Sequence, residues 1–158
     1  MKSGASAKYP TMTVDDICAL PIQDIAADDC VLFMWHVASQ PLEAFRVVES
    51  WGFTFKTMSG FTWAKVTARN KRWFGMGFYT RQGTENCLIA IKGKPKIRKH
   101  NIRNLIVAKA PIHSKKPDCV RGRIKRLCGD LPRVELFARH EVKGWSSFGN
   151  EVENSIEL

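Results

Sequence analysis

The sequence predicts a layered α/β domain, and three observations support this class. Apolar runs of strand length alternate along the chain with helical patterns, as they do in α/β folds. The 158 residues suffice for one domain with a substantial core, and 44% of them are hydrophobic. The chain shows no internal repeat and no interdomain linker. We therefore expect a single domain over residues 1–158, of which residues 1–8 are small, polar and poorly ordered.

The first third of the chain contains two expected helices and one expected strand. Thr13 is suited to cap a helix over residues 14–20. The continuous apolar run at residues 30–37 predicts a strand buried on both faces, as in parallel sheets. Pro41 opens a second helix, which ends at Gly52. The inward positions expected for this second helix are Leu42, Phe45, Val48 and Trp51.

Three further strands are expected in the middle of the chain. Residues 53–66 form a long strand with aromatic side chains at alternating positions, and Gly60 within it is a candidate β-bulge. Residues 86–91 form a buried strand, and residues 105–108 form a short one after a basic segment.

The last quarter of the chain gives the clearest helix and strand. Pro117 suits the first helical position, and Asp118 suits the first turn, where its charge meets the positive end of the helix dipole. Gly129 ends this helix. Its apolar face consists of Val120, Ile124, Leu127 and Cys128. Residues 134–138 then alternate in the manner of a half-buried strand.

Polar side chains gather where that last strand ends. They are Arg139, His140, Glu141, Asn150 and Glu151. Ligands of open α/β sheets bind outside the carboxyl ends of the strands, so these residues are candidates for a binding site. The alternative is a surface turn that closes a small α/β domain.

The net charge of +10 is distributed unevenly. Residues 1–55 carry a net charge of −4, residues 56–116 carry +14, and residues 117–158 hold equal numbers of acidic and basic residues. A basic stretch of this kind is the expected footprint of a polyanionic partner.

Residues 65–81 combine basic, aromatic and glycine residues. Lysine and arginine neutralise phosphates and aromatic faces stack on unpaired bases, so this composition favours nucleic-acid binding. The alternative is a solvated loop whose aromatic side chains tuck into the core. Residues 92–103 hold six more basic residues, which form either a second phosphate-contacting loop or a charged solubilising loop. The candidate phosphate contacts are Lys71, Arg72, Lys96, Arg98 and Lys99.

Composition argues against several classes of protein. No apolar run reaches the length of a membrane span, and no signal peptide opens the chain. The five cysteines have no paired spacing, which favours reduced thiols in the cytoplasm. Their spacing relative to the four histidines does not support a metal site, so we expect packed or surface residues and no metal.

The chain carries three short blocks in order: KPD at residues 116–118, ELFAR at residues 135–139, and Trp145 followed by GNE at residues 149–151. These blocks resemble the C-terminal half of the S-adenosylmethionine-dependent adenine-N6 methyltransferases. The branch is the one typified by the catalytic subunit of the mRNA adenosine methyltransferase, with many bacterial and phage members. The resemblance extends back to about Tyr9 and implies a Rossmann-like methyltransferase sheet with helices on both faces.

The resemblance also implies a reaction, a cofactor and the residues that bind them. The reaction is methyl transfer from S-adenosylmethionine to the exocyclic amine of adenine in DNA or RNA. Lys116 would meet the methionine carboxylate of the cofactor, and its ribose hydroxyls would meet Arg139, Asn150 and Glu151. The residues that match the family's loops around the target base are Gly77, Tyr79, Arg81 and Glu85.

The family's catalytic loop, Asp-Pro-Pro-Trp, has no match in this sequence. In the family its carboxylate and a backbone carbonyl accept hydrogen bonds from the adenine amine, while the base is turned out of its stack. The seven prolines of this chain are never adjacent, and only eight residues precede Tyr9, upstream of which that loop and its strand lie in the family. We therefore assign no catalytic residue and expect one strand of the sheet to be missing.

Three interpretations of function follow. The first is an adenine-N6 methyltransferase, with DNA favoured over RNA because the short chain has no additional RNA-binding module. The second is a non-catalytic nucleic-acid-binding relative or subunit. The third is a fragment, which an in-frame Asp-Pro-Pro-Trp upstream of the first codon would indicate. Without the missing strand, residues 30–37 and 134–138 would expose unpaired backbone groups, so we expect a homodimer, a second chain in the gap or a poorly stable monomer.

Overall fold

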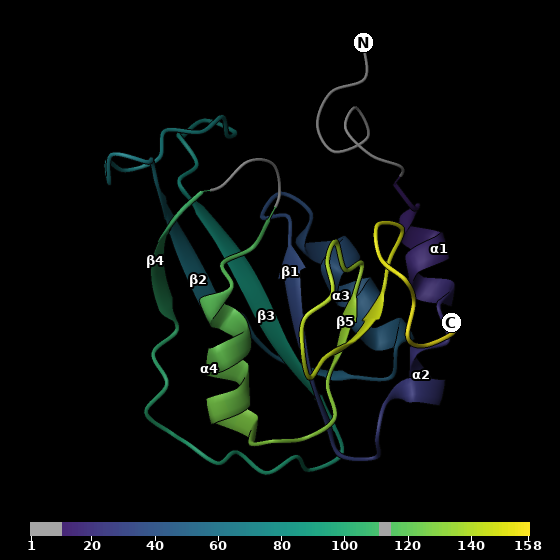
Figure 1. Ribbon diagram of the computed structural model, residues 1–158. Helices are drawn as coiled ribbons and strands as arrows, with labels where there is room; N and C mark the ends of the chain where they lie inside the picture. The colour runs from purple at the N-terminus through teal and green to yellow at the C-terminus, as the bar shows by residue number, and fades with distance from the viewer. Residues whose placement is uncertain (1–10, 111–114) are drawn as a thin grey trace. The chain divides into compact units, whose positions relative to one another are not determined.

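The computed structural model describes residues 11–110 and 115–158. Its elements, in chain order, are α1 (Val14–Ala19), α2 (Ile22–Ile25), β1 (Cys30–His36), α3 (Pro41–Ser50), β2 (Thr54–Val66), β3 (Thr84–Lys92), β4 (Leu105–Lys109), α4 (Cys119–Cys128), β5 (Val134–Leu136) and β6 (Ser146–Phe148) (Figure 1). Four strands form a mixed sheet in the order β1-β3-β2-β4, while β5 and β6 form a two-stranded sheet. The α/β class predicted from the sequence is confirmed.

The chain divides into two compact units. The first comprises Met1–Gly60 and Glu85–Pro95, and the second comprises Phe61–Thr84 and Lys96–Leu158. The expectation of a single domain remains a prediction.

The first unit is organised around the contact between α1 and α3. Thr13 caps α1 as expected, because its hydroxyl accepts the backbone N–H of Asp16 at 3.1 Å and the Asp16 carboxylate accepts the Thr13 N–H at 3.3 Å. Just after α3, the Trp51 indole nitrogen donates a hydrogen bond to the carbonyl of Ile17 at 2.8 Å. The cap therefore stabilises the start of α1, and the buried indole fixes the end of α3 to α1.

The face that α3 buries differs from the expected one. Its buried side chains are Ala44, Val47 and Val48, followed by Trp51. Leu42 is 77% exposed, so its predicted inward position was wrong. A spacing of three residues drifts around a helix with 3.6 residues per turn, whereas the observed positions keep to one stripe.

Strand β1 is not the centrally buried strand that its composition predicts. Its seven residues are all half-buried, and it lies at one end of the four-stranded sheet. It pairs antiparallel with β3, with Cys30 opposite Lys92 and His36 opposite Asn86. The prediction of burial on both faces, as in a parallel sheet, was therefore wrong. A continuous apolar run gives no information on whether a strand is central or at an edge.

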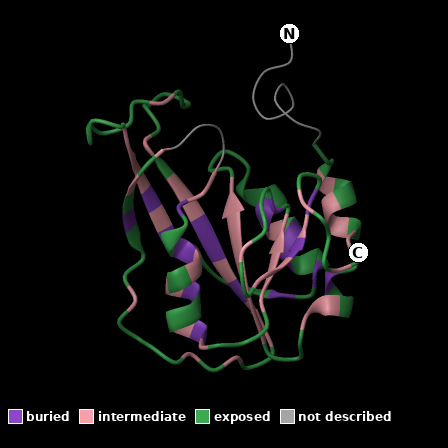
Figure 2. Cartoon of the chain, viewed as in Figure 1, coloured by how far each residue is buried: buried purple, intermediate pink, exposed green. Residues whose placement is uncertain are grey.

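Strand β2 runs through Gly60, where a side chain has no room. A Cβ at this position would lie 2.3 Å from Cγ1 of Ile89 and 3.1 Å from the carbonyl oxygen of Cys87. Gly60 thus permits the close approach of β3. The buried side chains of this unit, coloured purple in Figure 2, include Val48, Trp51, Cys87, Leu88 and Ala90.

The second unit combines the end of β2 with β4, α4 and the β5–β6 ladder. β4 pairs parallel with β2, and the buried Trp63 of β2 donates its indole N–H to the carbonyl of Ala108 at 3.0 Å. On α4 the buried residues are Val120, Ile124 and Cys128, as predicted, whereas Leu127 is half-buried.

The ends of α4 and β5 differ from prediction by one or two residues. Asp118 is the N-cap of α4 rather than a residue of its first turn, and Pro117 precedes it. Gly129 ends α4 with a φ of +93°, as expected. β5 ends at Leu136, because Phe137 adopts a φ of +57° and cannot continue the strand.

Candidate cofactor and nucleic-acid sites

The carboxyl ends of β5 and β6 bring two polar segments together. The strands are parallel and in register from Val134 opposite Ser146 to Leu136 opposite Phe148. Beyond the ladder, the Ala138 N–H donates to the carbonyl of Phe148 at 3.0 Å. The following residue, Gly149, lies so close that a Cβ there would be 2.3 Å from the carbonyl oxygen of Ala138. The residues after each strand are therefore neighbours.

Arg139 and Glu151 form an ion pair across this junction. The Arg139 Nε lies 3.0 Å from Oε1 of Glu151, and their side chains are 40% and 45% exposed. An exposed pair of this kind contributes only about 0–1 kcal/mol to stability. The pair therefore contributes little to the stability of the fold, and its charged groups are accessible to a ligand. Asn150, exposed and next to Glu151, completes a group of three predicted cofactor residues that the structure brings together.

Lys116, the fourth predicted cofactor residue, lies half-buried ahead of α4. Two residues later, the Asp118 carboxylate lies 4.0 Å from Nε2 of His140, the residue after Arg139. The start of α4 is thus beside the segment that follows β5. The Lys115 ammonium, with help from Arg121, holds the pKa of the Asp118 carboxyl below its ordinary value, so this carboxylate is ionised at neutral pH.

Sequence reasoning missed the ion pair that ties α4 to β5. Arg121 donates two hydrogen bonds to Glu135, from Nε to Oε2 at 2.7 Å and from Nη2 to Oε1 at 2.8 Å. The side chains are 18% and 31% exposed, and the Glu135 carboxylate raises the pKa of Arg121 above its ordinary value. This bidentate pair positions β5 and hence the candidate cofactor site. The sequence signal was Glu135 as the polar residue of an otherwise apolar strand.

Residues 67–83, between β2 and β3, form a self-paired loop that we call the aromatic-basic loop. The Lys65 N–H donates to the carbonyl of Gly83 at 2.8 Å, and the Trp73 N–H donates to the carbonyl of Lys65 at 3.1 Å. Farther out, Gly75 and Gln82 exchange backbone hydrogen bonds of 3.1 and 3.2 Å. The backbone therefore pairs with itself while the side chains face outward.

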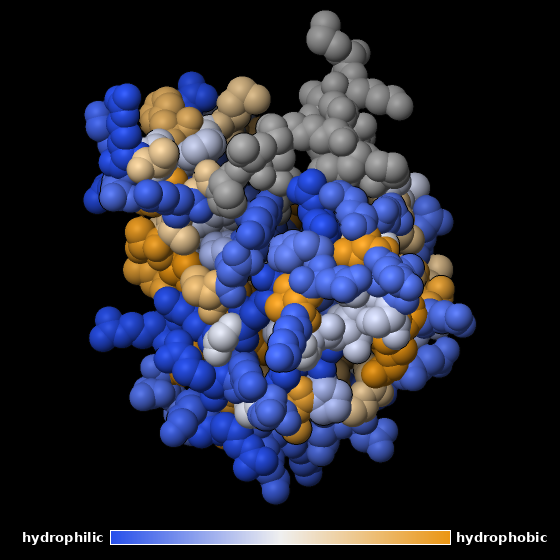
Figure 3. Space-filling view, viewed as in Figure 1, coloured by the Kyte–Doolittle hydropathy of each residue, from blue (hydrophilic) through white to orange (hydrophobic). Residues whose placement is uncertain are grey.

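Apolar side chains of this loop lie in solvent. The exposed fraction is 80% for Phe74, 90% for Met76 and 79% for Phe78, and Tyr79 is fully exposed. The alternative in which these aromatic residues tuck into the core is therefore wrong. Exposed apolar groups next to charged ones are visible over the loop in Figure 3. Exposed apolar surface of this kind is typical of interaction sites, so the loop is a candidate contact surface.

The predicted cations of the loop are exposed, and one of them lies over an aromatic ring. Lys71, Arg72 and Arg81 are exposed, and the Arg81 guanidinium lies 5.3 Å from the centroid of the Phe74 ring. A guanidinium over an aromatic face forms a cation–π contact. Glu85, in contrast, lies half-buried in β3 within the first unit, so it is not part of this exposed loop.

The second predicted set of cations lies elsewhere in the second unit. Lys96, Arg98 and Lys99 are exposed, and the Arg98 N–H donates to the carbonyl of Leu127 near the end of α4 at 2.7 Å. The β2–β4 ladder is parallel and runs from Thr62 opposite Leu105 to Val66 opposite Lys109. The aromatic-basic loop follows the Val66 end of this ladder, whereas residues 96–99 precede its Leu105 end. The basic stretch seen in the sequence is thus divided between two ends of one ladder.

A search of the described ranges, 11–110 and 115–158, finds no group of three or more metal-ligating side chains and no helix long and apolar enough to cross a membrane. All five cysteines lie within the described ranges, and none of them is in a disulfide there.

Comparisons with known proteins show the family of this chain. Residues 1–151 match the MT-A70 family. The Type II methyltransferase M.MunI of a Mycoplasma species is 38% identical over 99% of this chain and 65% of its own length. The N(6)-adenosine-methyltransferase catalytic subunit METTL3 of Homo sapiens is 31% identical over 92% of this chain and 25% of its own length. An MT-A70-like N(6)-adenosine-methyltransferase of Arabidopsis thaliana is 30% identical over 95% of this chain and 22% of its own. The chain thus spans less than two thirds of each relative, and it belongs to the MT-A70 family.

Proposed function

We propose that this chain supplies the cofactor site and a nucleic-acid contact of an S-adenosylmethionine-dependent adenine-N6 methyltransferase. The observation that carries the proposal is the Arg139–Glu151 pair at the carboxyl ends of β5 and β6, in a chain of the MT-A70 family. The similarity to proteins named as N(6)-adenosine methyltransferases supports the choice of reaction.

The residues at this end of the β5–β6 ladder fit the cofactor chemically. The Glu151 carboxylate and the Asn150 amide are suited to the vicinal hydroxyls of a ribose, and the Arg139 guanidinium orients the Glu151 carboxylate from one side. The Lys116 ammonium supplies a point charge for the methionine carboxylate. When bound, the cofactor provides the methyl group that is transferred. The residues named here bind and orient it.

The aromatic-basic loop is the proposed contact with the substrate strand. An adenine must leave its stack before its amine can be methylated, and an exposed aromatic side chain such as Tyr79 offers a face on which an unstacked base can lie. Lys71, Arg72 and Arg81 are exposed in the same loop and supply positive charge for the phosphates. We take DNA as the first substrate to test and RNA as the second.

No residue of this chain is assigned to the chemical step. The lone pair of the adenine amine is delocalised into the ring, so methylation requires acceptors placed on that amine. The 158 residues contain no two adjacent prolines and hence no Asp-Pro-Pro-Trp loop to supply them. The second candidate function is a nucleic-acid-binding relative or subunit that acts with another polypeptide.

We also propose that β1 and β5 each pair with a further strand. Among the strands of the described residues, β1 lies at one end of the four-stranded sheet and β5 lies in the two-stranded sheet with β6. We expect a homodimer, a complex with a second chain or a poorly stable monomer. Sedimentation and hydrogen exchange at residues 32–35 and 135–137 check this. A compact monomer with strong protection of both segments would contradict it.

The proposed function is tested by cofactor binding and methyl transfer with purified residues 1–158. Equilibrium dialysis with S-adenosylmethionine at millimolar concentration should detect weak binding. A tritiated-methyl assay on adenine-containing DNA and RNA should detect no transfer, because the acceptors for the amine are absent. Sustained turnover would show that a residue of this chain replaces the tetrapeptide.

Two matched carboxylate variants make the binding experiment specific. Glu151→Gln should weaken the retained binding about tenfold, as expected for the loss of one charge-assisted hydrogen bond. Glu153→Gln, two residues away and also exposed, should leave it unchanged. Equal effects of the two substitutions would remove Glu151 from the site. Absence of both cofactor and nucleic-acid binding would overturn the proposed function.

A further inference from the structure

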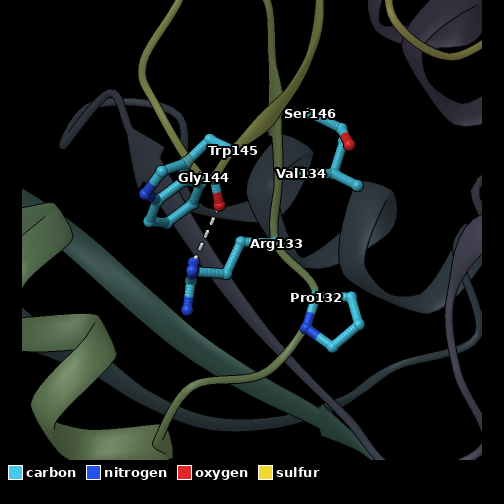
Figure 4. A pocket seen from close by; sticks show the side chains of 6 residues that line it. All are labelled: Pro132, Arg133, Val134, Gly144, Trp145 and Ser146. Carbon is cyan, nitrogen blue, oxygen red and sulfur yellow. Dashed lines mark hydrogen bonds between the residues drawn. The ribbon is translucent and has the colours of Figure 1, made fainter.

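A cavity of about 280 Å³ lies at the amino ends of β5 and β6, opposite to the Arg139–Glu151 pair. Val134 and Ser146, the first residues of the two strands, form part of its wall. Figure 4 shows Gly144 and Trp145, just before β6, close to Arg133, just before β5. The hollow therefore lies at the amino end of the ladder, whereas the proposed cofactor residues lie at its carboxyl end.

A larger hollow of about 480 Å³ shares three residues with this cavity, namely Arg133, Gly144 and Trp145. We call the two together the Arg133 hollow. The larger part adds residues of α4 and of the adjoining turns, which are Arg121, Gly122, Lys125, Asp130 and Lys143. Its lining thus has four basic side chains and one carboxylate. The larger part, of about 480 Å³, is within the range of volumes of small-ligand sites.

Arg133 forms a fixed wall of this hollow. Its Nε donates to the carbonyl of Gly144 at 3.2 Å, and its Nη1 donates to Oδ1 of Asp130 at 2.9 Å. Its guanidinium also lies 5.8 Å from the centroid of the Trp145 ring. With three contacts and a side chain only 14% exposed, Arg133 holds one orientation. The site therefore has a preorganised element.

The charges in the hollow do not cancel. Arg121 is committed to Glu135, while Lys125 and Arg133 share the single carboxylate of Asp130, at 3.2 and 2.9 Å. Lys143 is exposed, and within the described ranges no acidic group lies within ion-pair distance of it. Two lysines therefore face the hollow with more positive charge than the single carboxylate offsets.

We propose that the Arg133 hollow binds a phosphate of the nucleic-acid strand, through Lys125 and Lys143, at the end of the ladder opposite to the cofactor site. The inference rests on the proposed function and adds a second contact with the same substrate class. Lysines act as point charges on phosphate oxygens, and a fixed guanidinium and indole give the phosphate a rigid wall. A phosphate ester reaches the hollow either in a strand or as a free nucleotide, and the experiment distinguishes these sources.

The test is the salt dependence of DNA binding by the full chain, measured by fluorescence anisotropy with a single-stranded oligonucleotide. A plot of the logarithm of the binding constant against the logarithm of the salt concentration has a negative slope. The steepness of this slope decreases by roughly 0.7 for each single-strand phosphate contact that is lost. The double variant Lys125→Gln/Lys143→Gln should therefore flatten the slope by roughly one to one and a half units. Lys56→Gln, an exposed lysine on β2 far along the chain from the hollow, is the matched control and should leave the slope unchanged.

A second variant, Lys71→Ala/Arg72→Ala in the aromatic-basic loop, separates this inference from the proposed function. If the loop variant flattens the slope and the hollow variant does not, the inference is overturned and the proposed function stands. If only the hollow variant flattens it, the loop contact of the proposed function is overturned. Flattening by both supports both. An unchanged slope in both variants overturns both.

Adenosine 5′-monophosphate and inorganic phosphate serve as the small-ligand arm. If the bound phosphate belongs to a nucleic-acid strand, neither small ligand should bind at submillimolar concentration. A single phosphate gains little binding free energy without the contacts made by the neighbouring nucleotides. Tight binding of the free nucleotide, lost in Lys125→Gln/Lys143→Gln while the oligonucleotide slope is unchanged, would overturn the assignment to a strand. Both lysines are exposed, so the thermal midpoint of the double variant should match that of the unsubstituted chain.

Discussion

The aromatic-basic loop and the β5–β6 ladder present their functional groups in opposite ways. In the loop, the backbone pairs with itself and Phe74, Phe78 and Tyr79 stand in solvent. In the ladder, polar side chains are held by partners, as Glu135 is by Arg121 and Glu151 is by Arg139. The loop is therefore suited to a large and variable polymer. The carboxyl end of the ladder is suited to a small ligand that requires fixed geometry.

The two regions also differ in how well the net charge of a stretch of sequence predicts the charge on its surface. Residues 56–116 have a net charge of +14, and their basic side chains are mostly exposed, so the count and the surface agree. Residues 117–158 have no net charge, yet their carboxylates are partly taken up by structural pairs and the Arg133 hollow is left with an excess of cations. A ligand meets the local charge rather than the average.

The largest effect on stability is expected at the backbone contact that holds the ladder together. Gly149→Ala would place a Cβ 2.3 Å from the carbonyl oxygen of Ala138 and 2.7 Å from its nitrogen, so the segments must separate. We expect a loss of about 1–3 kcal/mol in the free energy of unfolding, together with loss of cofactor binding.

The matched control is Gly122→Ala on α4. A Cβ at Gly122 meets nothing within 4 Å, so this substitution should stabilise the chain by about 0.5–1 kcal/mol through helix propensity. Urea denaturation compares the two. Equal and small effects would mean that the ladder is not held by close backbone contact.

A smaller loss is expected when the pair between α4 and β5 is broken. Glu135→Gln removes the charge and one of the two acceptor oxygens that the largely shielded Arg121 uses, which should lower the free energy of unfolding by about 1–1.5 kcal/mol. Glu151→Gln at the exposed Arg139 pair should cost about 0–1 kcal/mol. If chemical denaturation gave Glu151→Gln the greater cost, the distinction between a structural and a ligand-facing carboxylate would be lost.

The smallest effect on stability is expected in the aromatic-basic loop. Tyr79→Ala removes a fully exposed ring, so the thermal midpoint should stay unchanged. Binding to single-stranded DNA should weaken by about 1–3 kcal/mol, as for the loss of one stacked base. Anisotropy titrations at fixed salt measure this. Unchanged affinity, with Phe74→Ala also silent, would show that the exposed rings do not contact bases.

Much of the fold could be read from the sequence because its signals are local. The Thr13 cap, the Gly129 stop and the apolar face of α4 depend on neighbouring residues, and each was found where expected. The edge position of β1 depends on which strands pair, which a run of apolar residues does not encode. Arg121 and Glu135 were missed for the same reason, since they are brought together by the packing of α4 against β5.

The sequence likewise predicted some residues of the candidate sites, but not how they are exposed or distributed. Arg139, Asn150 and Glu151 were recognised by resemblance, and the parallel register of β5 and β6 explains why they meet. The exposure of the loop's aromatic side chains and the division of the basic stretch between two ends of the β2–β4 ladder required the structure.

The most direct test of the account is a titration of the ¹⁵N-labelled chain with S-adenosylmethionine, followed by amide chemical shifts. Our account predicts that the perturbed amides cluster at residues 116–118, 138–140 and 149–151, even if the affinity is only millimolar. Glu151→Gln should reduce these shifts. Perturbations confined to the Arg133 hollow, or no perturbation at millimolar cofactor, would contradict the claim that the carboxyl ends of β5 and β6 form the cofactor site.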